Sequence, residues 1–289
     1  MTVARRAEAL GYASVWNFQR LLYPVAPRNE YYGSPGAWPE AFRSTLDPIV
    51  ALTWAAAHTR TIRLGVSVLV MPFYQPIVLA KQLATLDVMA AGRLEVGLGI
   101  GWSLDEYEAA GVPPGRRGAR ADEFLRVLAA AWGDDPVEFR GEFYRIPRAH
   151  VQPKPVQRPR PPLLVGGYSE SVLRRAASLA DGYTGGNIPL ADLEGVVARV
   201  RAAARAAGRD PAQFRIVCRG VFRLTEAPLG AGRRALSGSL EEVRDDIRRY
   251  EAAGVSELFL DPNFQPGGAE LGAVLKQMEA LAPGVTQRR

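Results

Sequence analysis

Apolar residues are spaced as in β-strands in some segments of this chain and as in α-helices in others, and the two kinds of segment alternate. Residues 62–72 (IRLGVSVLVMP) form an apolar, β-branched run that is typical of a buried strand. Residues 75–92 follow with apolar positions at helical spacing and end at a glycine. Residues 93–102 (RLEVGLGIGW) are strand-like again. Two strands separated by one amphipathic helix predict a right-handed βαβ unit with parallel strands.

The same alternation continues along almost the whole chain, which is typical of a parallel sheet covered by helices. Strands are expected at residues 13–17, 62–70, 94–98, 162–165, 182–185, 214–224 and 257–260. Helices are expected at residues 3–10, 46–58, 75–90, 116–132, 169–179, 190–207, 240–253 and 269–281. The length of 289 residues suits a single α/β domain, a TIM-type (β/α)8 barrel over residues 1–289. An insertion at about 103–161 is expected to contain a hairpin. It follows the fourth strand of the barrel if a missing first strand is counted.

The expected strands number seven, and a closed barrel of this type needs eight because an open edge leaves unpaired backbone groups. The chain opens in the middle of what would be the first βα unit. Either the first strand is missing from this chain or the barrel is open at one seam. We favour the missing strand.

Composition narrows the class of protein. Hydrophobic residues make up 47% and charged residues 23%, as in an ordinary globular protein, and no apolar run is long enough to cross a bilayer. With no signal-peptide pattern and with Cys218 as the single cysteine, we expect a cytoplasmic protein without a disulfide or a membrane partner. The net charge of +6 is not gathered into a basic stripe with interleaved aromatics, so no nucleic-acid partner is expected.

Small residues mark the ends of two neighbouring predicted strands. The first strand ends in the sequence GVSV at 65–68, and the second ends in GLGIG at 97–101. Ligands of parallel α/β folds bind at the carboxyl ends of the strands, and glycine there lets a flat molecule approach the backbone. The glycines lack the spacing G-x-G-x-x-G, and no acidic residue follows at the usual distance, so they are not a dinucleotide fingerprint.

An ordered series of motifs resembles the bacterial luciferase-like monooxygenase superfamily, in particular its coenzyme F420-dependent oxidoreductase branch. The matching stretches are residues 5–16, 60–102, 116–128, 141–147, 153–167, 174–183, 206–211 and 237–255. The resemblance covers nearly all of the chain. It implies a (β/α)8 barrel that binds a flavin or a deazaflavin at its carboxyl-terminal face.

The resemblance also implies which residues surround the ring of the cofactor. A non-prolyl cis peptide is expected between Ser67 and Val68, behind the ring. Gly99, Trp102 and Asp105 match positions near the ring or the ribityl chain. Trp102 is equally well explained as packing at the mouth of the barrel.

The segment Gly166, Gly167, Tyr168 and Ser169 joins a predicted strand to the start of a helix. Free N–H groups at a helix N-terminus bind anions, and the helix dipole adds to this. The resemblance places the phosphate of the cofactor here, and Ser169 is expected to cap the helix as well. The alternative is a plain helix cap.

Asn17 and Gln19 are the candidate catalytic residues. They match a strand end where many relatives carry an Asp-His or Glu-Arg pair, and here Gln19 and Arg20 occupy the aligned positions. An amide cannot transfer protons, so these residues are expected to hydrogen-bond a carbonyl or the edge of the cofactor. Arg20 either steadies an anionic group or lies solvated at the surface.

Two loops are candidate lids over the site. Residues 23–38 are aromatic and rich in proline and glycine, and residues 228–238 carry Arg233 and Arg234 in a flexible setting. The two arginines either meet the acidic tail of F420 or form a solvated basic loop, which we favour slightly.

The expected function is F420-dependent hydride transfer to or from a small organic substrate, by a homodimer. The alternatives are an FMN-dependent monooxygenase of the same superfamily and a barrel that has lost its cofactor. With two histidines outside any metal-ligand spacing and one cysteine, no metal site is expected.

Overall fold

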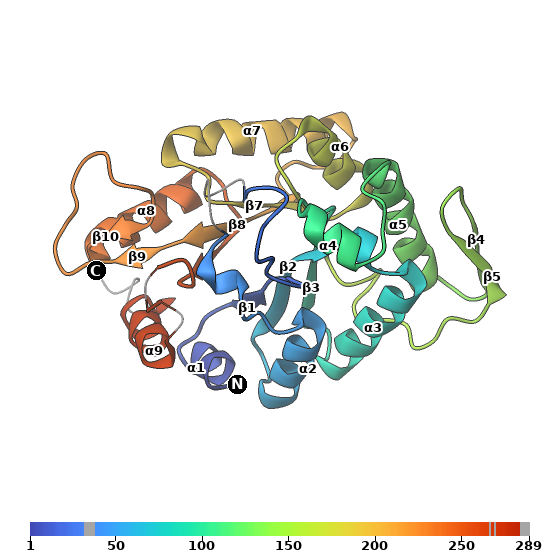
Figure 1. Cartoon of the computed structure of the whole chain (residues 1–289), viewed down its shortest axis with the longest axis horizontal. Helices are drawn as coiled ribbons and strands as arrows, with labels where there is room; N and C mark the ends of the chain where they lie inside the picture. The colour runs from blue at the N-terminus through green and yellow to red at the C-terminus, as the bar shows by residue number, and fades with distance from the viewer. Residues whose placement is uncertain (32–37, 266, 269, 284–289) are drawn as a thin grey trace. The chain divides into compact units, whose positions relative to one another are not determined.

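The computed structural model describes residues 1–31, 38–265, 267–268 and 270–283 (Figure 1). The chain divides into two compact units. Unit 1 comprises Met1–Trp16, Thr61–Arg63 and Leu164–Arg289, and unit 2 comprises Asn17–Arg60 and Leu64–Leu163.

The βαβ unit predicted at residues 62–102 is present in unit 2. It consists of β2 (Arg63–Val70), α3 (Pro76–Met89) and β3 (Leu94–Gly99). β2 and β3 pair in parallel, from Leu64 opposite Leu94 to Val70 opposite Gly99, with a register shift between Val66 and Leu69. All six residues of β3 are buried, as expected of a central strand in a parallel sheet.

The remaining elements of unit 2 surround this βαβ unit in sequence. They are η1 (Glu40–Phe42), α2 (Pro48–His58), η2 (Met71–Phe73), α4 (Leu104–Ala109), α5 (Arg117–Trp132), β4 (Val137–Arg140) and β5 (Arg145–Ala149). Asp47 caps α2, because its carboxylate accepts a hydrogen bond from the N–H of Val50. β4 and β5 pair antiparallel, which confirms the hairpin predicted within the insertion. Side chains of α5 and the hairpin share a small buried cluster of Val127, Val137 and Ile146.

Unit 1 consists mainly of parallel strands that alternate with helices. Its elements are α1 (Thr2–Ala9), β6 (Leu163–Gly166), α6 (Glu170–Leu179), β7 (Gly182–Gly186), α7 (Leu190–Ala206), β8 (Arg215–Val221), β9 (Arg223–Leu224), β10 (Ser237–Gly238), α8 (Leu240–Ala252), β11 (Glu257–Asp261) and α9 (Leu271–Ala280). β6 pairs with β7, β7 with β8, and β8 with β11, all in parallel.

The main sheet has seven strands in the order β1-β2-β3-β6-β7-β8-β11, with β1 at Ser14–Asn17. The predicted number of strands and the parallel α/β alternation are therefore confirmed. Within unit 1, side chains of the outer strands β1 and β11 contact each other. Trp16 stacks on Phe259 with ring centroids 4.9 Å apart, and Trp16 Nε1 donates to Glu257 at 3.0 Å.

The segment predicted as one strand at 214–224 is divided in two. β8 ends at Val221, and after Phe222 the short strand β9 pairs in parallel with β10, which lies inside the loop predicted at 228–238. The backbone of Arg223 donates to the carbonyl of Leu236, and that of Thr225 donates to Gly238. These bonds hold the end of the loop, while its flexibility elsewhere stays a prediction.

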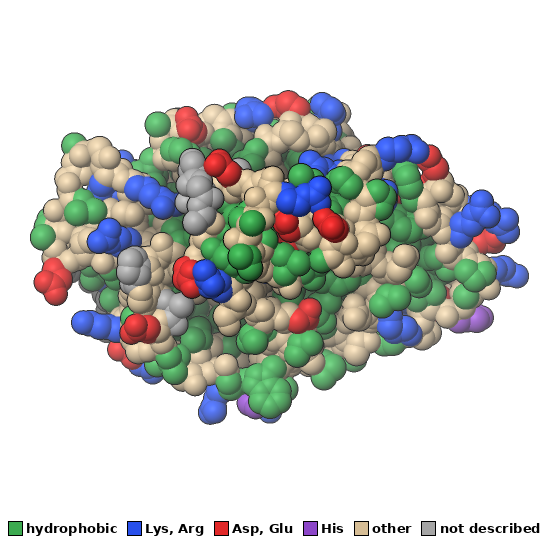
Figure 2. All heavy atoms as spheres, viewed as in Figure 1, with side chains coloured by type: hydrophobic (Ala, Val, Ile, Leu, Met, Phe, Trp, Pro, Cys, Tyr) green, Lys and Arg blue, Asp and Glu red, His purple; other side chains and the backbone are tan. Residues whose placement is uncertain are grey.

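Helix α2 carries apolar side chains that the described residues leave uncovered. Val50 and Trp54 lie one helical turn apart and are exposed, as is Leu46 just before the helix. Hydrophobic side chains are visible at the surface over α2 in Figure 2. No helix among the described residues is long and apolar enough to cross a membrane.

Candidate active site

The strand ends of β2 and β3 in unit 2 carry the first group of candidate residues. The peptide bond between Ser67 and Val68 is cis, as the resemblance implied. A Cβ atom on Gly97 would lie 2.5 Å from the carbonyl oxygen of Val66, and one on Gly99 would lie 2.6 Å from Cγ2 of Val68. Packing of β2 on β3 already requires these glycines, because atoms of β2 fill the space that glycine leaves. Contact between Gly99 and a cofactor ring stays a prediction.

Asn17 ends β1 and carries an unpaired acceptor. Its Nδ2 donates to the carbonyl of Pro48 at 3.1 Å, while its Oδ1 is buried and has no hydrogen-bond partner among the described residues. An unsatisfied buried acceptor costs about 1–3 kcal/mol, so such atoms in folded proteins call for a partner. A donor on a bound ligand, such as a ring N–H, would satisfy it.

Gln19 is buried, with 3% of its surface exposed, and both the oxygen and the nitrogen of its side-chain amide form hydrogen bonds. Its Oε1 accepts from the N–H of Val70 at 2.7 Å, and its Nε2 donates to the hydroxyl of Tyr74 at 2.7 Å. Gln19 therefore ties the segment after β1 to the end of β2. In this arrangement it positions other groups.

Tyr74 is a polar residue that sequence reasoning missed. Among the described residues, its hydroxyl makes only the hydrogen bond from Gln19, in which the oxygen is the acceptor, so the hydroxyl hydrogen is available to a ligand. Burial raises the pKa of Tyr74, and the charge of Asp47 adds to this, which keeps the phenol protonated at neutral pH. The sequence did contain a signal for Tyr74, because this residue follows directly after a predicted strand, in the sequence FYQP at 73–76.

Arg20 neither lies in solvent nor is free to bind an anion, so both predicted alternatives were wrong. Its Nη1 is 2.9 Å from Oε2 of Glu106, and the side chains of the pair are 11% and 2% exposed. Its guanidinium also lies over the rings of Phe42 and Trp102, at 5.0 and 5.1 Å from their centroids. Glu106 accepts from the N–H of Leu21 at 2.7 Å as well, so it fixes the segment that carries Gln19.

Trp102 and Asp105 both contact the aromatic loop that was predicted as a lid. The ring of Trp102 lies 4.6 Å from that of Trp38 and 5.3 Å from that of Tyr31, measured between centroids. Asp105 accepts from the N–H of Arg28 at 3.0 Å. Packing therefore accounts for the position of Trp102. Residues 32–37 of the predicted lid lie outside the described residues, and contact of Trp102 or Asp105 with a cofactor stays a prediction.

The segment from Gly166 to Ser169, in unit 1, is a separate candidate for binding an anion. Gly167 has a φ of +141°, and a Cβ atom there would lie 2.9 Å from Cγ2 of Val172, so only glycine fits. Ser169 occupies the N-cap position of α6, as predicted, but its side chain makes no capping hydrogen bond and instead pairs with the hydroxyl of Ser171 at 2.8 Å. The expected side-chain cap was wrong.

The start of α6 suits an anion because no cap covers its amides. The only acidic residue in the first turn, Glu170, is paired with Arg199, whose Nε lies 3.0 Å from the carboxylate. The hydroxyl of Tyr168 donates to the carbonyl of Gly186 at 3.2 Å, which links this turn to the end of β7. Free amides, the positive end of a helix dipole and a neutralised carboxylate together fit a phosphate group.

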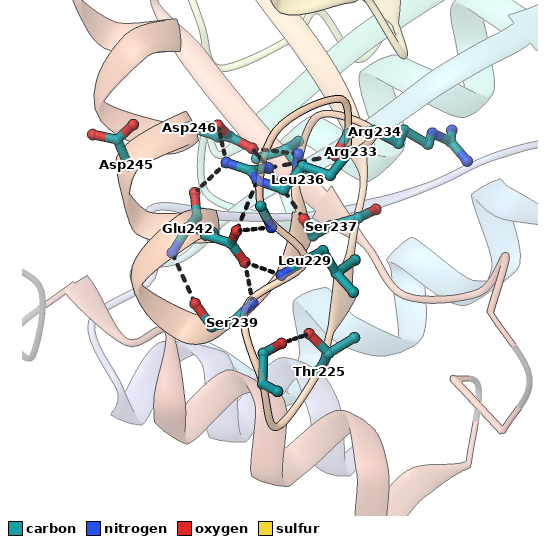
Figure 3. A network of polar contacts seen from close by, with 12 residues as sticks. Thr225, Leu229, Arg233, Arg234, Leu236, Ser237, Ser239, Glu242, Asp245 and Asp246 are labelled. Carbon is teal, nitrogen blue, oxygen red and sulfur yellow. Dashed lines mark hydrogen bonds and ion pairs between the residues drawn. The ribbon is translucent and has the colours of Figure 1, made fainter.

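Arg233 and Arg234 differ in their surroundings (Figure 3). Arg233 donates to the fully buried carboxylate of Asp246, at 2.8 Å from Nη2 to Oδ1, and its Nε lies 3.4 Å from Glu242. Hydrogen bonds from the N–H groups of Leu229 and Ser239 hold the pKa of Glu242 down to about 2. Arg233 thus anchors its loop and is neither solvated nor free for a ligand, whereas the side chain of Arg234 points away from this network.

Parallel strands alternating with helices, with polar groups and an uncapped helix start at strand ends, are typical of the α/β barrel enzymes. The family model of luciferase-like monooxygenases matches residues 1–233, and the chain is therefore a member of this family. Among the proteins similar to this chain are an FMNH2-dependent monooxygenase, a further monooxygenase and an F420-dependent alcohol dehydrogenase.

Two relatives illustrate the sequence similarity. An uncharacterized protein of Mycobacterium tuberculosis is 37% identical over 183 residues, which are 62% of this chain and 64% of that protein. The FMNH2-dependent dimethylsulfone monooxygenase of Pseudomonas putida is 37% identical over 148 residues, which are 50% of this chain and 39% of that enzyme. The matches thus span less than two thirds of the length of either relative.

Two solved structures share the fold. The monooxygenase RslO1 of Streptomyces bottropensis is 25% identical, with a TM-score of 0.79 over 98% of this chain and 91% of that one. An F420-dependent secondary alcohol dehydrogenase is 19% identical, with a TM-score of 0.78 over 98% of this chain and 93% of that one. These likenesses confirm the predicted fold class, the TIM-type α/β barrel of the luciferase-like enzymes.

Proposed function

We propose that the protein binds coenzyme F420 and uses it to transfer hydride to or from a small organic substrate. The observation that supports binding of a phosphorylated cofactor is the anion cradle at Gly167–Ser169, and the protonated phenol of Tyr74 supports hydride transfer. The first helical turn of the cradle has no side-chain cap, and its one carboxylate is paired with Arg199. In a luciferase-like enzyme, a phosphate cradle at a strand end is the place for a phosphorylated flavin or deazaflavin.

Three side chains of unit 2 would act on the ring and the substrate. The bound deazaflavin supplies the hydride chemistry, while the protein orients the reactants and excludes water. Asn17 Oδ1 accepts a hydrogen bond from a ligand donor, since it has no other partner among the described residues. Tyr74 donates its hydroxyl hydrogen to a substrate oxygen, and Gln19 fixes the orientation of that hydroxyl.

The direction of the reaction follows from these groups. The phenol of Tyr74 is protonated at neutral pH because its pKa is raised, so it can polarise a carbonyl or an activated double bond but cannot act as a base. Asn17 and Gln19 transfer no protons. This set suits reduction of the substrate better than oxidation of an alcohol.

A specific observation favours a second candidate, an FMN-dependent monooxygenase. The Pseudomonas enzyme with 37% identity is FMNH2-dependent, and the Streptomyces structure is that of a monooxygenase. The phosphate cradle serves FMN as well as F420. The third candidate, a barrel without a cofactor, would leave the acceptor of Asn17 and the cradle without a ligand.

Titration of the purified protein with F420 and with FMN separates the three candidates. We expect saturable quenching of deazaflavin fluorescence by the protein. Retention of FMN with oxygen consumption would support the monooxygenase instead, and failure of both ligands to bind would leave only the barrel without a cofactor. Gly167→Ala should weaken binding of F420, because the added Cβ strains the cradle, and should leave binding of the unphosphorylated ring and ribityl fragment unchanged. Gly195→Ala, in the interior of α7 where nothing lies near the added atom, is the matched control.

A further inference from the structure

Unit 1 contains a cavity of ≈ 500 Å³ between the end of β8, the loop before β10 and the segment after β11. Its walls include the apolar side chains of Val221, Phe222, Leu229 and Phe264. Its charged side chains are arginines, Arg223 and Arg234 besides the buried Arg233, and none of the lining residues is acidic. We call it the arginine cavity.

The walls of the arginine cavity are held by hydrogen bonds to two carboxylates of α8, Asp246 and Glu242. Asp246, at the floor of the loop, accepts hydrogen bonds from Arg233 and from the N–H of Leu236, the latter at 2.7 Å. Glu242 accepts from the N–H groups of Leu229 and Gly230 at 3.0 and 2.8 Å. A preformed cavity loses little conformational entropy when a ligand enters.

Two cations of this cavity are available to a ligand. Neither Arg223 nor Arg234 forms a hydrogen bond or an ion pair through its guanidinium with any described residue, and both side chains are exposed. Arg234 extends away from the Arg233 network in Figure 3. A cavity with two open guanidinium groups, apolar walls and no lining carboxylate fits carboxylate or phosphate groups on an organic chain.

The arginine cavity lies on the same edge of the sheet as the phosphate cradle, and residues of unit 1 connect the two. Tyr168 bonds to the carbonyl of Gly186 at the end of β7, and a Cβ atom on Gly186 would meet Nε of Arg219 at 3.4 Å. The guanidinium of Arg219 lies over the ring of Phe264, 5.1 Å from its centroid, and Phe264 lines the cavity. β6 and β8 are two strand spacings apart, so their ends are roughly 10 Å from each other. A chain of two or three extended residues is long enough to span this distance.

We propose that the arginine cavity binds, through Arg223 and Arg234, the carboxylates of the acidic tail that is joined to the phosphate of the cofactor. This inference rests on the proposed function. It assigns these arginines a role in choosing the cofactor, because FMN ends at its phosphate and has no carboxylates to place in the cavity.

The test compares F420 carrying two or more glutamates with F420-0, which keeps the ring, the ribityl chain and the phosphate but has no glutamate. Dissociation constants are measured by quenching of deazaflavin fluorescence at low salt. The wild-type protein should bind the tailed form more tightly, and Arg223→Gln/Arg234→Gln should weaken binding of that form about 3- to 30-fold. Binding of F420-0 should be unchanged, which also shows that the variant is folded. The preference for the tailed form should shrink in ~1 M salt, because these arginines are exposed.

The matched control is Arg248→Gln/Arg249→Gln, which removes the same charge from exposed arginines of α8 that pair with Asp245. It should leave both dissociation constants unchanged. Equal binding of the two forms by the wild-type protein would overturn this inference while the proposed function stands, and so would equal losses in the variant and its control. If the protein binds FMN alone, or neither cofactor, the proposed function and this inference both fail.

Discussion

Loss of Asp246 should lower the stability of unit 1 by a measurable amount. Its carboxylate is fully buried and accepts hydrogen bonds from the guanidinium of Arg233 and from the N–H of Leu236. Asp246→Ala would leave a largely buried guanidinium and a buried amide without this acceptor. Breaking a buried ion pair by removing one partner costs about 3–5 kcal/mol. Glu242, 3.4 Å from Nε of Arg233, offsets part of this, so we expect about 3 kcal/mol.

A loss of this size is measurable, because the free energy of unfolding of a typical domain is about 5–15 kcal/mol. The assay is urea denaturation followed by circular dichroism, with the free energy of unfolding extrapolated to water. Asp245→Ala is the control, one residue earlier on the same helix. Its carboxylate is exposed and pairs with Arg248 and Arg249 at 3.3 and 3.0 Å, so its loss should cost at most about 0.5 kcal/mol.

A double variant separates the charge from the packing. Arg233→Met/Asp246→Leu removes both members of the pair and fills the space with apolar side chains, so it should be more stable than Asp246→Ala alone. If Asp246→Ala and Asp245→Ala lower the free energy of unfolding by the same amount, the loop is not held by the buried pair. The account of a preformed arginine cavity would then be wrong.

Three further predictions concern the site, the pH dependence and the assembly. Tyr74→Phe should lower kcat for the F420-dependent reaction at least about 10²-fold, as measured by stopped-flow kinetics. The dissociation constant for F420, measured by titration, should be unchanged. If the variant and the wild-type protein have equal kcat, Tyr74 has no part in the mechanism. The folded pKa of Glu242, about 2, lies below its ordinary value, so the stability it contributes is complete above about pH 4.5 and is lost as the pH falls toward 2. Glu242→Gln should flatten the acid side of a plot of unfolding midpoint against pH, and an unchanged plot would contradict this. Exposed Val50 and Trp54 on α2 suit a homodimer contact, so Trp54→Glu should shift the mass by light scattering from dimer to monomer, and a wild-type monomer would refute the proposal.

The strands and helices could be predicted because their signals are local. The apolar runs at residues 62–70 and 94–98 match β2 and β3 within one residue at each end. The helix expected at 75–90 is α3, which begins at Pro76 and whose end is followed by Gly92 in the left-handed conformation. The division of residues 214–224 into β8 and β9 could not be read in this way, because it depends on β10, which lies more than ten residues later.

The polar contacts of the site could not be predicted, since their partners are far apart in the sequence. Arg20 and Glu106 are separated by 86 residues, and Gln19 and Tyr74 by 55. The local pattern was misleading in one case: Ser103 and Glu106 have the spacing of a capping box. Ser103 does cap α4, but the carboxylate of Glu106 accepts from Leu21 and Arg20 instead of returning to the start of its own helix.

The two neighbouring arginines at 233 and 234 show why charge along a sequence is a poor guide to charge available for a ligand. They have the same side chain and the same loop, yet Arg233 is neutralised by Asp246, thirteen residues later on α8, whereas Arg234 points away from that network and lines the arginine cavity. The same holds at Arg20, which is paired with Glu106. What remains for an anion is set by the carboxylates that folding brings to each guanidinium. We therefore expect binding of an acidic cofactor tail to depend on the two exposed arginines of this cavity, and not on the net charge of +6 that the whole chain carries.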